Sequence, residues 1–197
     1  MARPPRFDES VLLDAAVRLV TAAGPAAVTM AAVARESGAP NGSVYHRFPQ
    51  RAALLAALWL RTVERFQDGY LATLNSAPEP LPAARAAARH VVAWSRANPQ
   101  EAALLLHGPD EFGRAEWPEE YVRRAKRGNR GVLEAVTRVA ESLGATTPAE
   151  TERISLAVID LPLGIVRRHL GSDHGLPEYA EDLAECCAAD LIGDRAK

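Results

Sequence analysis

The sequence predicts an all-α protein in two parts, a three-helix helix-turn-helix domain over residues 1–50 and a second helical domain over residues 51–197, with about nine helices in all. Apolar residues recur three and four positions apart along almost the whole chain, whereas no segment shows the apolar–polar alternation of a strand. Glycine and proline fall at the ends of these periodic segments, where they begin or end helices.

The N-terminal third of the chain contains four periodic segments, which predict helices over residues 9–23, 30–37, 40–48 and 50–75. Asp8 and Thr29 each precede a helix and can cap its free N–H groups. Gly24 and Gly38 end the first two helices, and Pro49 ends the third because its ring cannot continue a helix.

A proline-rich linker over residues 76–82 precedes helices expected over residues 82–97, 99–107, 118–143, 148–171 and 177–192. Residues 108–117 are expected to form a loop. The helix over 148–171 is apolar on all sides, which predicts burial on more than one face, and Pro162 within it should bend it.

The charge is unevenly distributed along the chain. Residues 1–55 carry six arginines and four acids, a charge of +2, and the other residues carry 17 basic and 21 acidic groups, a charge of −4. A basic N-terminal segment followed by an acidic remainder fits a small phosphate-binding domain joined to a domain with a different function. The absence of a long apolar run, of a signal-peptide core and of a disulfide framework predicts a cytoplasmic protein that does not enter membranes.

The stretch over residues 29–51 carries the functional prediction. Two helices of about two turns, joined by a turn that contains Gly38, are typical of a helix-turn-helix. Val44 and Phe48 belong to the inward face and should pack against the first helix. The outward face of the third helix is polar and aromatic and has no carboxylate, which suits approach to a polyanion such as double-stranded DNA.

The chemistry of these residues predicts their roles on DNA. Thr29 starts a helix whose free N–H groups suit a backbone phosphate, and Gly42 allows close approach to a groove wall. Tyr45 and His46 can each donate a hydrogen bond to a phosphate oxygen, and Arg51 can make a charged phosphate contact. The residues expected to meet base edges in the major groove are Pro40, Asn41 and Ser43.

This stretch resembles the tetracycline-repressor (TetR) family of bacterial regulators. The residues that match the family pattern in order and spacing are Thr29, Val33, Ala34, Gly38, Gly42, Ser43, Val44, Tyr45, His46 and Phe48. The resemblance implies a homodimer on a palindromic operator, joined through the helices over 148–171 and 177–192. It also implies a pocket for a small-molecule effector, enclosed by the middle helices. Two positions depart from the pattern: Pro40 replaces a hydroxyl or basic residue, and Arg51 replaces the usual lysine.

The candidate effector contacts on those middle helices are Trp59, Phe66, His90, Trp94, His107 and Tyr121. Aromatic residues at such positions also serve as ordinary core, so both interpretations stay open. Asp160, inside an apolar helix, can hydrogen-bond a ligand or lie in the dimer interface. The sequence identifies no effector.

Three classes of function were compared. A ligand-responsive repressor, released from its operator by an effector, agrees best with the resemblance. The alternative is a constitutive DNA-binding factor without a ligand, which predicts a packed body. An enzyme is not expected, because the sequence shows no nucleophile–base pair, phosphate loop, cofactor motif or metal cluster. The neighbours Cys186 and Cys187 are interpreted as small buried hydrophobes rather than as a redox sensor.

Overall fold

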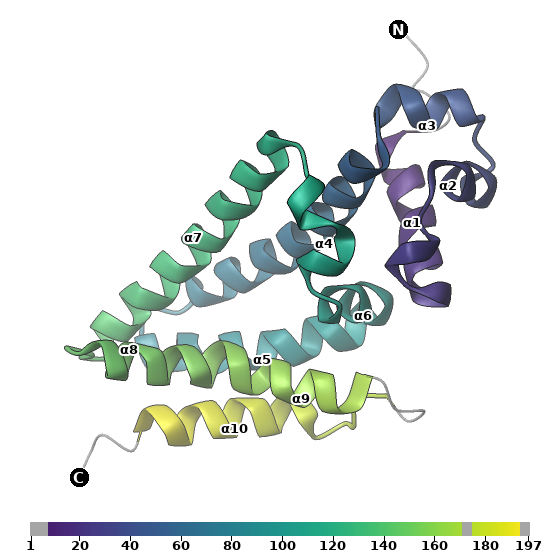
Figure 1. Cartoon of the computed structure of the whole chain (residues 1–197). Coiled ribbons are helices and arrows are strands. Elements are labelled where there is room, and N and C mark those ends of the chain that lie inside the picture. The colour runs from purple at the N-terminus through teal and green to yellow at the C-terminus, as the bar shows by residue number, and fades with distance from the viewer. Residues whose placement is uncertain (1–7, 171–174, 194–197) are drawn as a thin grey trace, which may run out of the picture. The chain divides into compact units, whose positions relative to one another are not determined.

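The computed structural model describes residues 8–170 and 175–193, and every regular element in these ranges is helical, which confirms the all-α prediction (Figure 1). The contacts divide the chain into two compact units. Unit 1 comprises Met1–Val63 and Ala103–Lys126, and unit 2 comprises Glu64–Ala102 and Arg127–Lys197. The predicted division of function after residue 50 stays a prediction. No helix among the described residues is both long and apolar enough to cross a bilayer.

Unit 1 opens with the elements of the predicted helix-turn-helix. Its elements are α1 (Glu9–Ala23), the 3-10 turn η1 (Pro25–Ala27), α2 (Met30–Ser37), α3 (Asn41–Arg47), the first part of α4 (Arg51–Leu74), the end of α6 (Pro99–Leu106), the turns η2 (Pro109–Phe112) and η3 (Arg114–Glu116), and the start of α7 (Glu119–Ser142). The expected loop over residues 108–117 therefore contains two short 3-10 turns.

Local capping explains where the first two helices begin. The Asp8 carboxylate accepts a hydrogen bond from the Val11 N–H at 3.0 Å, and this bond lowers the pKa of Asp8. The Thr29 hydroxyl accepts from the Ala32 N–H at 3.1 Å. Gly38 ends α2 in the left-handed conformation, with a φ of 68°, which glycine adopts without strain. All three residues act as the sequence predicts.

Unit 2 contains the rest of α4 and of α7. Its other elements are α5 (Pro80–Ala97), the start of α6, α8 (Pro148–Ser155), the π-helical turn η4 (Leu156–Asp160), α9 (Leu161–Leu170) and α10 (Ala180–Gly193). The expected helix over 148–171 is described to Leu170, and Gly171 lies outside the described residues. Instead of a simple bend, a π-turn comes just before Pro162.

Two helix starts differ from the prediction by two residues or more. Helix α5 begins at Pro80, two residues earlier than expected, because proline is tolerated in a first turn that needs no internal N–H donor. Helix α10 begins at Ala180 rather than at 177. The guanidinium of Arg96 donates to the carbonyls of Leu176 and Pro177 at 2.8 and 2.9 Å, which holds these residues in the approach to the helix.

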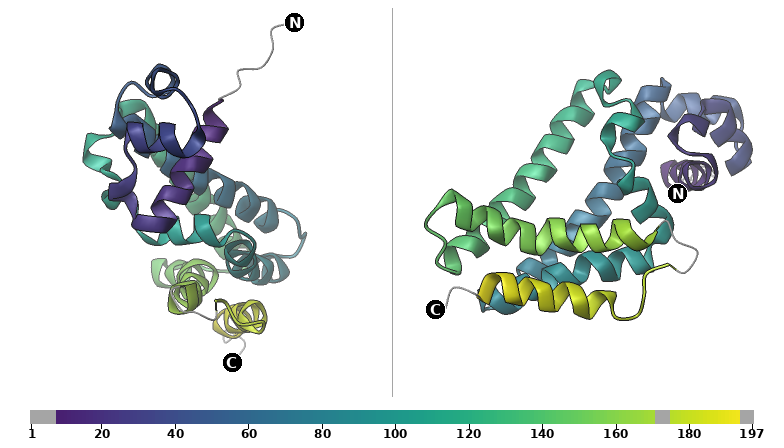
Figure 2. Two further views of the ribbon diagram at one scale, coloured as in Figure 1. Left: turned by 90° about the vertical axis from the view of Figure 1, so that its right-hand side faces the viewer. Right: turned by 60° about the horizontal axis from the view of Figure 1, so that its bottom comes forward.

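Helix α10 runs beside α5 (Figure 2). The two helices pack through small residues and through charges. Its buried residues are four positions apart and form one core cluster with the alanines of α5: Ala180, Ala184, Ala188 and Ile192. Beside this seam, Arg85 pairs with Glu185 at 2.9 Å and Arg96 pairs with Glu181 at 2.8 Å. Arg89 pairs with Glu181, Asp182 and Glu185. All acids in the first half of α10 are therefore directed toward α5.

Helices α4 and α5 meet where a glycine faces a histidine. A Cβ atom built on Gly69 would lie 2.8 Å from Cε1 and 2.9 Å from Nε2 of His90. The imidazole therefore rests directly on the Gly69 backbone, and its buried Nε2 has no hydrogen-bond partner among residues 8–170 and 175–193. Burial lowers the pKa of His90 below its usual 6.5, which favours the neutral ring.

We predict that Gly69→Ala destabilises the protein by about 1–3 kcal/mol relative to Gly131→Ala, because the new methyl group overpacks against the ring. Gly131 is a matched control in α7, since a Cβ there meets no atom within 4 Å. At that control site alanine should add about 0.5–1 kcal/mol of stability. Urea unfolding measures both changes. In a His90→Ala background the Gly69→Ala penalty should disappear, and a penalty that persists would contradict this packing.

Candidate nucleic-acid interface

Helix α3 is held by its inward face. Val44 and Phe48 are 0% and 1% exposed and lie in the core cluster of unit 1, which also contains Leu12, Ala16 and Val33. The second helix therefore packs against the first as predicted, and the third packs against the second and shares their core cluster. Because α3 has only seven residues, these tertiary contacts must supply its stability. Its outward side chains are thus presented from a fixed support.

Seven of the eight predicted DNA-contacting residues belong to α3, to the turn before it or to the N-cap of α2, and the eighth, Arg51, begins α4. Tyr45 is 55% exposed, and Ser43 is half-buried. The other exposed members are Thr29, Pro40, Asn41, Gly42 and His46. A Cβ atom on Gly42 would meet nothing within 4 Å in the free protein, so this glycine leaves open space on the surface. Their roles on DNA stay predictions.

Arg51 is exposed, but its guanidinium bonds two backbone carbonyls of the same chain. Its Nε donates to the Val28 carbonyl at 2.7 Å, and its Nη2 donates to the Pro25 carbonyl at 3.1 Å. The residue therefore ties the start of α4 to the turn between α1 and α2. This arrangement gives Arg51 a structural role that the sequence analysis did not expect, while its predicted phosphate contact stays a prediction.

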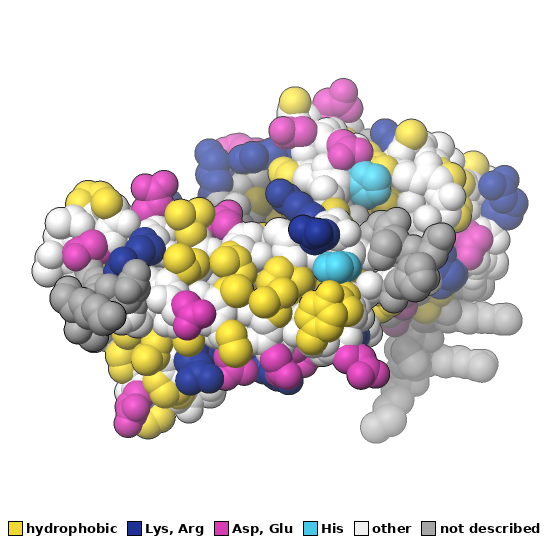
Figure 3. Space-filling model, turned by 90° about the horizontal axis from the view of Figure 1, so that it is seen from below, with side chains coloured by type: hydrophobic (Ala, Val, Ile, Leu, Met, Phe, Trp, Pro, Cys, Tyr) yellow, Lys and Arg dark blue, Asp and Glu magenta, His cyan; other side chains and the backbone are white. Residues whose placement is uncertain are grey.

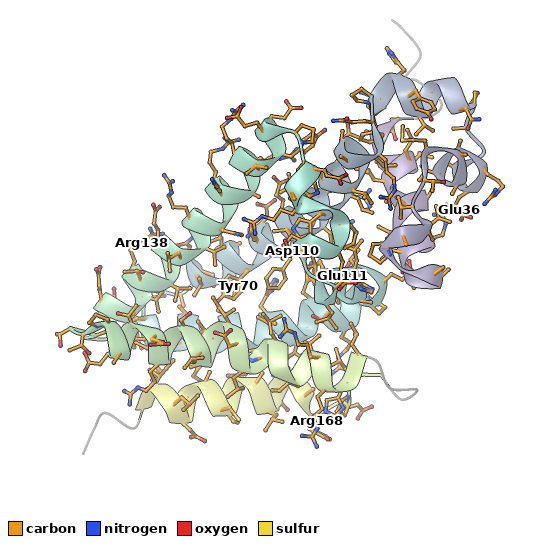
Figure 4. The ribbon with its side chains drawn as sticks, in the orientation of Figure 1. Glu36, Tyr70, Asp110, Glu111, Arg138 and Arg168 are labelled. Carbon is orange, nitrogen blue, oxygen red and sulfur yellow. The ribbon has the colours of Figure 1, made fainter. Side chains whose placement is uncertain are left out.

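Two further cations flank the surface. Arg35 in α2 and Arg47 in the last turn of α3 are both exposed, and neither was among the predicted contacts. The one acid of α2, Glu36, is paired with Arg18 of α1 at 2.7 Å (Figure 4). This pairing offsets a negative charge that would otherwise oppose a phosphate. A search for every exposed cation within residues 29–51 would have found Arg35 and Arg47.

The seven candidate effector residues fall into both units. Trp59, His107 and Tyr121 belong to unit 1, where the Trp59 ring lies 5.2 Å from that of Phe112 and Nδ1 of His107 lies 2.9 Å from the Glu111 carboxylate. Phe66, His90, Trp94 and Asp160 belong to unit 2.

Within unit 2, three of these candidates form an aromatic cluster with Tyr70. The Phe66 ring lies 5.3 Å from Trp94, 6.1 Å from His90 and 5.8 Å from Tyr70. Asp160, by contrast, is exposed at the end of the π-turn.

Two grooves in unit 2 lie apart from this cluster. One of about 500 Å³ is lined by α7 and the start of α8, including Leu133, Val136 and Thr151. Another of about 270 Å³ is lined by the end of α4, the start of α5 and α7. None of the seven candidates lines either groove, so the effector site stays a prediction.

The predicted dimer helices leave large apolar side chains uncovered. Leu156 is 47% exposed, Tyr179 just before α10 is 60% exposed, and Leu183 and Leu191 on α10 are 41% and 37% exposed. Figure 3 shows this side of the molecule, with hydrophobic side chains gathered along its middle. Cys186 is also exposed, contrary to its interpretation as a buried hydrophobe, whereas Cys187 is half-buried.

Comparison with known proteins identifies the helix-turn-helix. The sequence model of the tetR family of bacterial regulatory proteins matches residues 12–58. No curated protein sequence matches the chain.

Solved structures share the fold over nearly the full length. A TetR-family regulatory protein from Rhodococcus RHA1 is 19% identical, with a TM-score of 0.73, and the match covers 95% of this chain and 97% of that one. A TetR-family transcription regulator from Marinobacter aquaeolei VT8 is 21% identical, with a TM-score of 0.72 and coverage of 92% and 93%. The regulator FadR from Bacillus subtilis, solved in complex with stearoyl-CoA, is 11% identical, with a TM-score of 0.68 and coverage of 94% and 98%.

The helix-turn-helix over residues 12–58 thus matches the TetR-family model, and the chain as a whole shares the fold of TetR-family regulators.

Proposed function

We propose that the protein is a repressor that binds a palindromic operator as a homodimer and is released by a small-molecule effector. The observation that carries this proposal is the exposed, carboxylate-free surface of α3, supported from below by buried Val44 and Phe48. A short helix that is anchored on one face and polar on the other suits entry into a major groove.

On DNA, α3 lies in the major groove with its N-terminal residues toward the bases. Asn41 stands at the first position of α3, where its amide can pair with the N6 and N7 atoms of adenine. Tyr45 and His46 lie one turn later and donate to the phosphate backbone. The free N–H groups at the start of α2 bind a phosphate on the other side of the groove.

We predict that Asn41→Ala weakens operator binding by about 1–3 kcal/mol and relaxes the preference at one base pair, because a direct base contact is lost. Arg47→Ala should weaken binding to all sequences alike and reduce the slope of log K against log salt by about one unit. Fluorescence anisotropy on a selected inverted-repeat oligonucleotide and on random DNA measures both effects. Asn75→Ala, at an exposed site outside the helix-turn-helix, is the matched control. Equal losses on specific and random DNA for Asn41→Ala would contradict base reading.

The second copy is proposed to cover the outward faces of α8, η4, α9 and α10. The arginines of α5 hold Glu181, Asp182 and Glu185 on one side of α10. Large apolar side chains are exposed beside them: Leu156 in η4, Tyr179 just before α10, and Leu183 and Leu191 on α10. Such an uncovered apolar stripe with its charges at the edge is typical of a permanent interface between copies. Pairing of these helices across a twofold axis would form a four-helix bundle.

We predict that Leu183→Glu combined with Leu156→Glu converts the dimer into monomers, because each charge would be buried against an apolar partner surface. Sedimentation velocity at micromolar concentration measures the mass. Leu133→Glu is the control, since Leu133 is 62% exposed on α7, outside the proposed face. If the wild-type protein, the double variant and Leu133→Glu all have the same mass, the two copies meet elsewhere or not at all.

The proposed effector is largely apolar. The Phe66, Trp94 and His90 cluster offers ring faces, and the lowered pKa of His90 keeps its imidazole neutral near pH 7. Small-molecule sites usually combine such apolar walls with a few polar groups. The FadR protein of the same fold was solved in complex with stearoyl-CoA, which makes long-chain acyl-CoA thioesters a reasonable first class to test.

We predict that a screen of stearoyl-CoA and apolar aromatic compounds by thermal denaturation finds a compound that raises the melting temperature. The same compound should weaken operator binding, and Trp94→Ala should weaken its effect while leaving operator binding without the compound unchanged. If compounds bind but operator affinity never changes, or if none binds, the protein acts as a constitutive DNA-binding factor.

A further inference from the structure

The helix that runs from α8 through η4 into α9 contains a break in its hydrogen-bond ladder. In the π-turn, the Leu161 N–H donates to the Leu156 carbonyl, five residues back. The next residue, Pro162, has no N–H. In an α-helix, residue 162 would donate to the Val158 carbonyl, four residues back. Val158 is 1% exposed, so water does not readily replace this donor.

The missing donor comes from another helix. The Tyr70 hydroxyl of α4 donates to the Val158 carbonyl at 3.2 Å, from a position 88 residues away in the sequence. The Tyr70 side chain is 1% exposed and packs against Phe66 and His90 (Figure 4). Burial, and secondarily the Asp160 carboxylate, raises the pKa of Tyr70, so the hydroxyl keeps its proton and acts as a donor.

We propose that the Tyr70–Val158 hydrogen bond is a latch that holds the π-turn and thereby sets which side chains of α8 and α9 face a second copy. The proposal rests on the proposed homodimer and names the residue that positions its interface. Tyr70 is a positioning residue, because it acts through the helix rather than by contact with the partner.

The geometry of a π-turn explains why the latch matters for the surface. A π-turn needs one more residue than an α-turn, so it shifts the following residues by about 100° relative to an uninterrupted α-helix. In the structure, the exposed residues before and after the π-turn follow one another at every fourth position: Glu152, Leu156, Asp160 and Gly164. Loss of the π-turn would rotate α9 against α8, and Leu156 and Gly164, eight residues apart, would then lie about 80° apart around the helix.

The latch also connects two proposed sites. Tyr70 belongs to the same aromatic cluster as Phe66 and His90, which are candidate effector contacts. Its hydroxyl reaches the backbone of the proposed dimer helix. A displacement of this cluster therefore acts directly on the donor that the Val158 carbonyl needs, through a contact that lies entirely within unit 2.

The test is a double-mutant cycle. Tyr70→Phe removes only the hydroxyl and should weaken dimerisation about tenfold, because it leaves a buried carbonyl without a donor. Hydrogen–deuterium exchange of the amides over residues 156–166 should become faster in the same variant. Pro162→Ala restores an N–H that can bond the Val158 carbonyl, so in this background Tyr70→Phe should change neither quantity. A role of the tyrosine in packing alone would not be rescued in this way.

Tyr121→Phe is the matched control, since it removes a half-buried tyrosine hydroxyl in unit 1 and should leave both quantities unchanged. Unchanged exchange in Tyr70→Phe would overturn the latch, whatever the state of assembly. A second outcome is that Tyr70→Phe exchanges faster but dimerises as well as wild type, while Leu183→Glu combined with Leu156→Glu still dissociates the protein. This outcome would overturn the positioning role of Tyr70 and leave the homodimer intact. If Tyr70→Phe exchanges faster but the wild-type protein is itself monomeric, the homodimer would be overturned instead.

Discussion

The proposed DNA-binding surface depends on the burial of one face of α3. Val44 and Phe48 are almost completely buried among residues of α1 and α2, and a helix of seven residues has too few internal hydrogen bonds to persist without such support. Because the inward face is fixed, the direction of Asn41 and Tyr45 is fixed as well. Arg51 strengthens the same unit from the other side by bonding the carbonyls of Val28 and Pro25.

In unit 2, charge placement decides which face of α10 stays free. The arginines at positions 85, 89 and 96 of α5 pair with acids at 181, 182 and 185, and the alanines of both helices fill the seam between them. Each exposed pair contributes little stability alone. Together they select one rotation of α10, and this rotation leaves Tyr179 and Leu183 uncovered. The apolar stripe is thus a consequence of pairing inside the chain.

At the π-turn, a carbonyl that lacks its donor within the helix accepts a hydrogen bond from a distant residue. Pro162 deprives a buried carbonyl of its helical donor, and a buried carbonyl without a donor costs about 1–3 kcal/mol. The structure supplies the donor from Tyr70 of α4, which makes the conformation of one helix depend on the position of another. The proposed response to an effector requires such dependence, and the Tyr70 hydroxyl is the group proposed to supply it.

The sequence by itself determined the all-α fold, most helix ends, and which residues of the helix-turn-helix face inward and which face outward. These properties follow from the spacing of apolar residues and from caps such as Thr29 and Gly38, whose partners lie within one helical turn. Among the candidate site residues, the exposed surface around Tyr45 was predictable because periodicity alone separates inward from outward positions.

Only the tertiary structure decided the partners of Arg51, Arg96 and Tyr70, the late start of α10 and the exposure of Cys186. Each depends on backbone carbonyls or helix faces from distant parts of the chain. A pattern in the sequence records which residues share a helix face, but it carries no distance between that face and an atom 88 residues away.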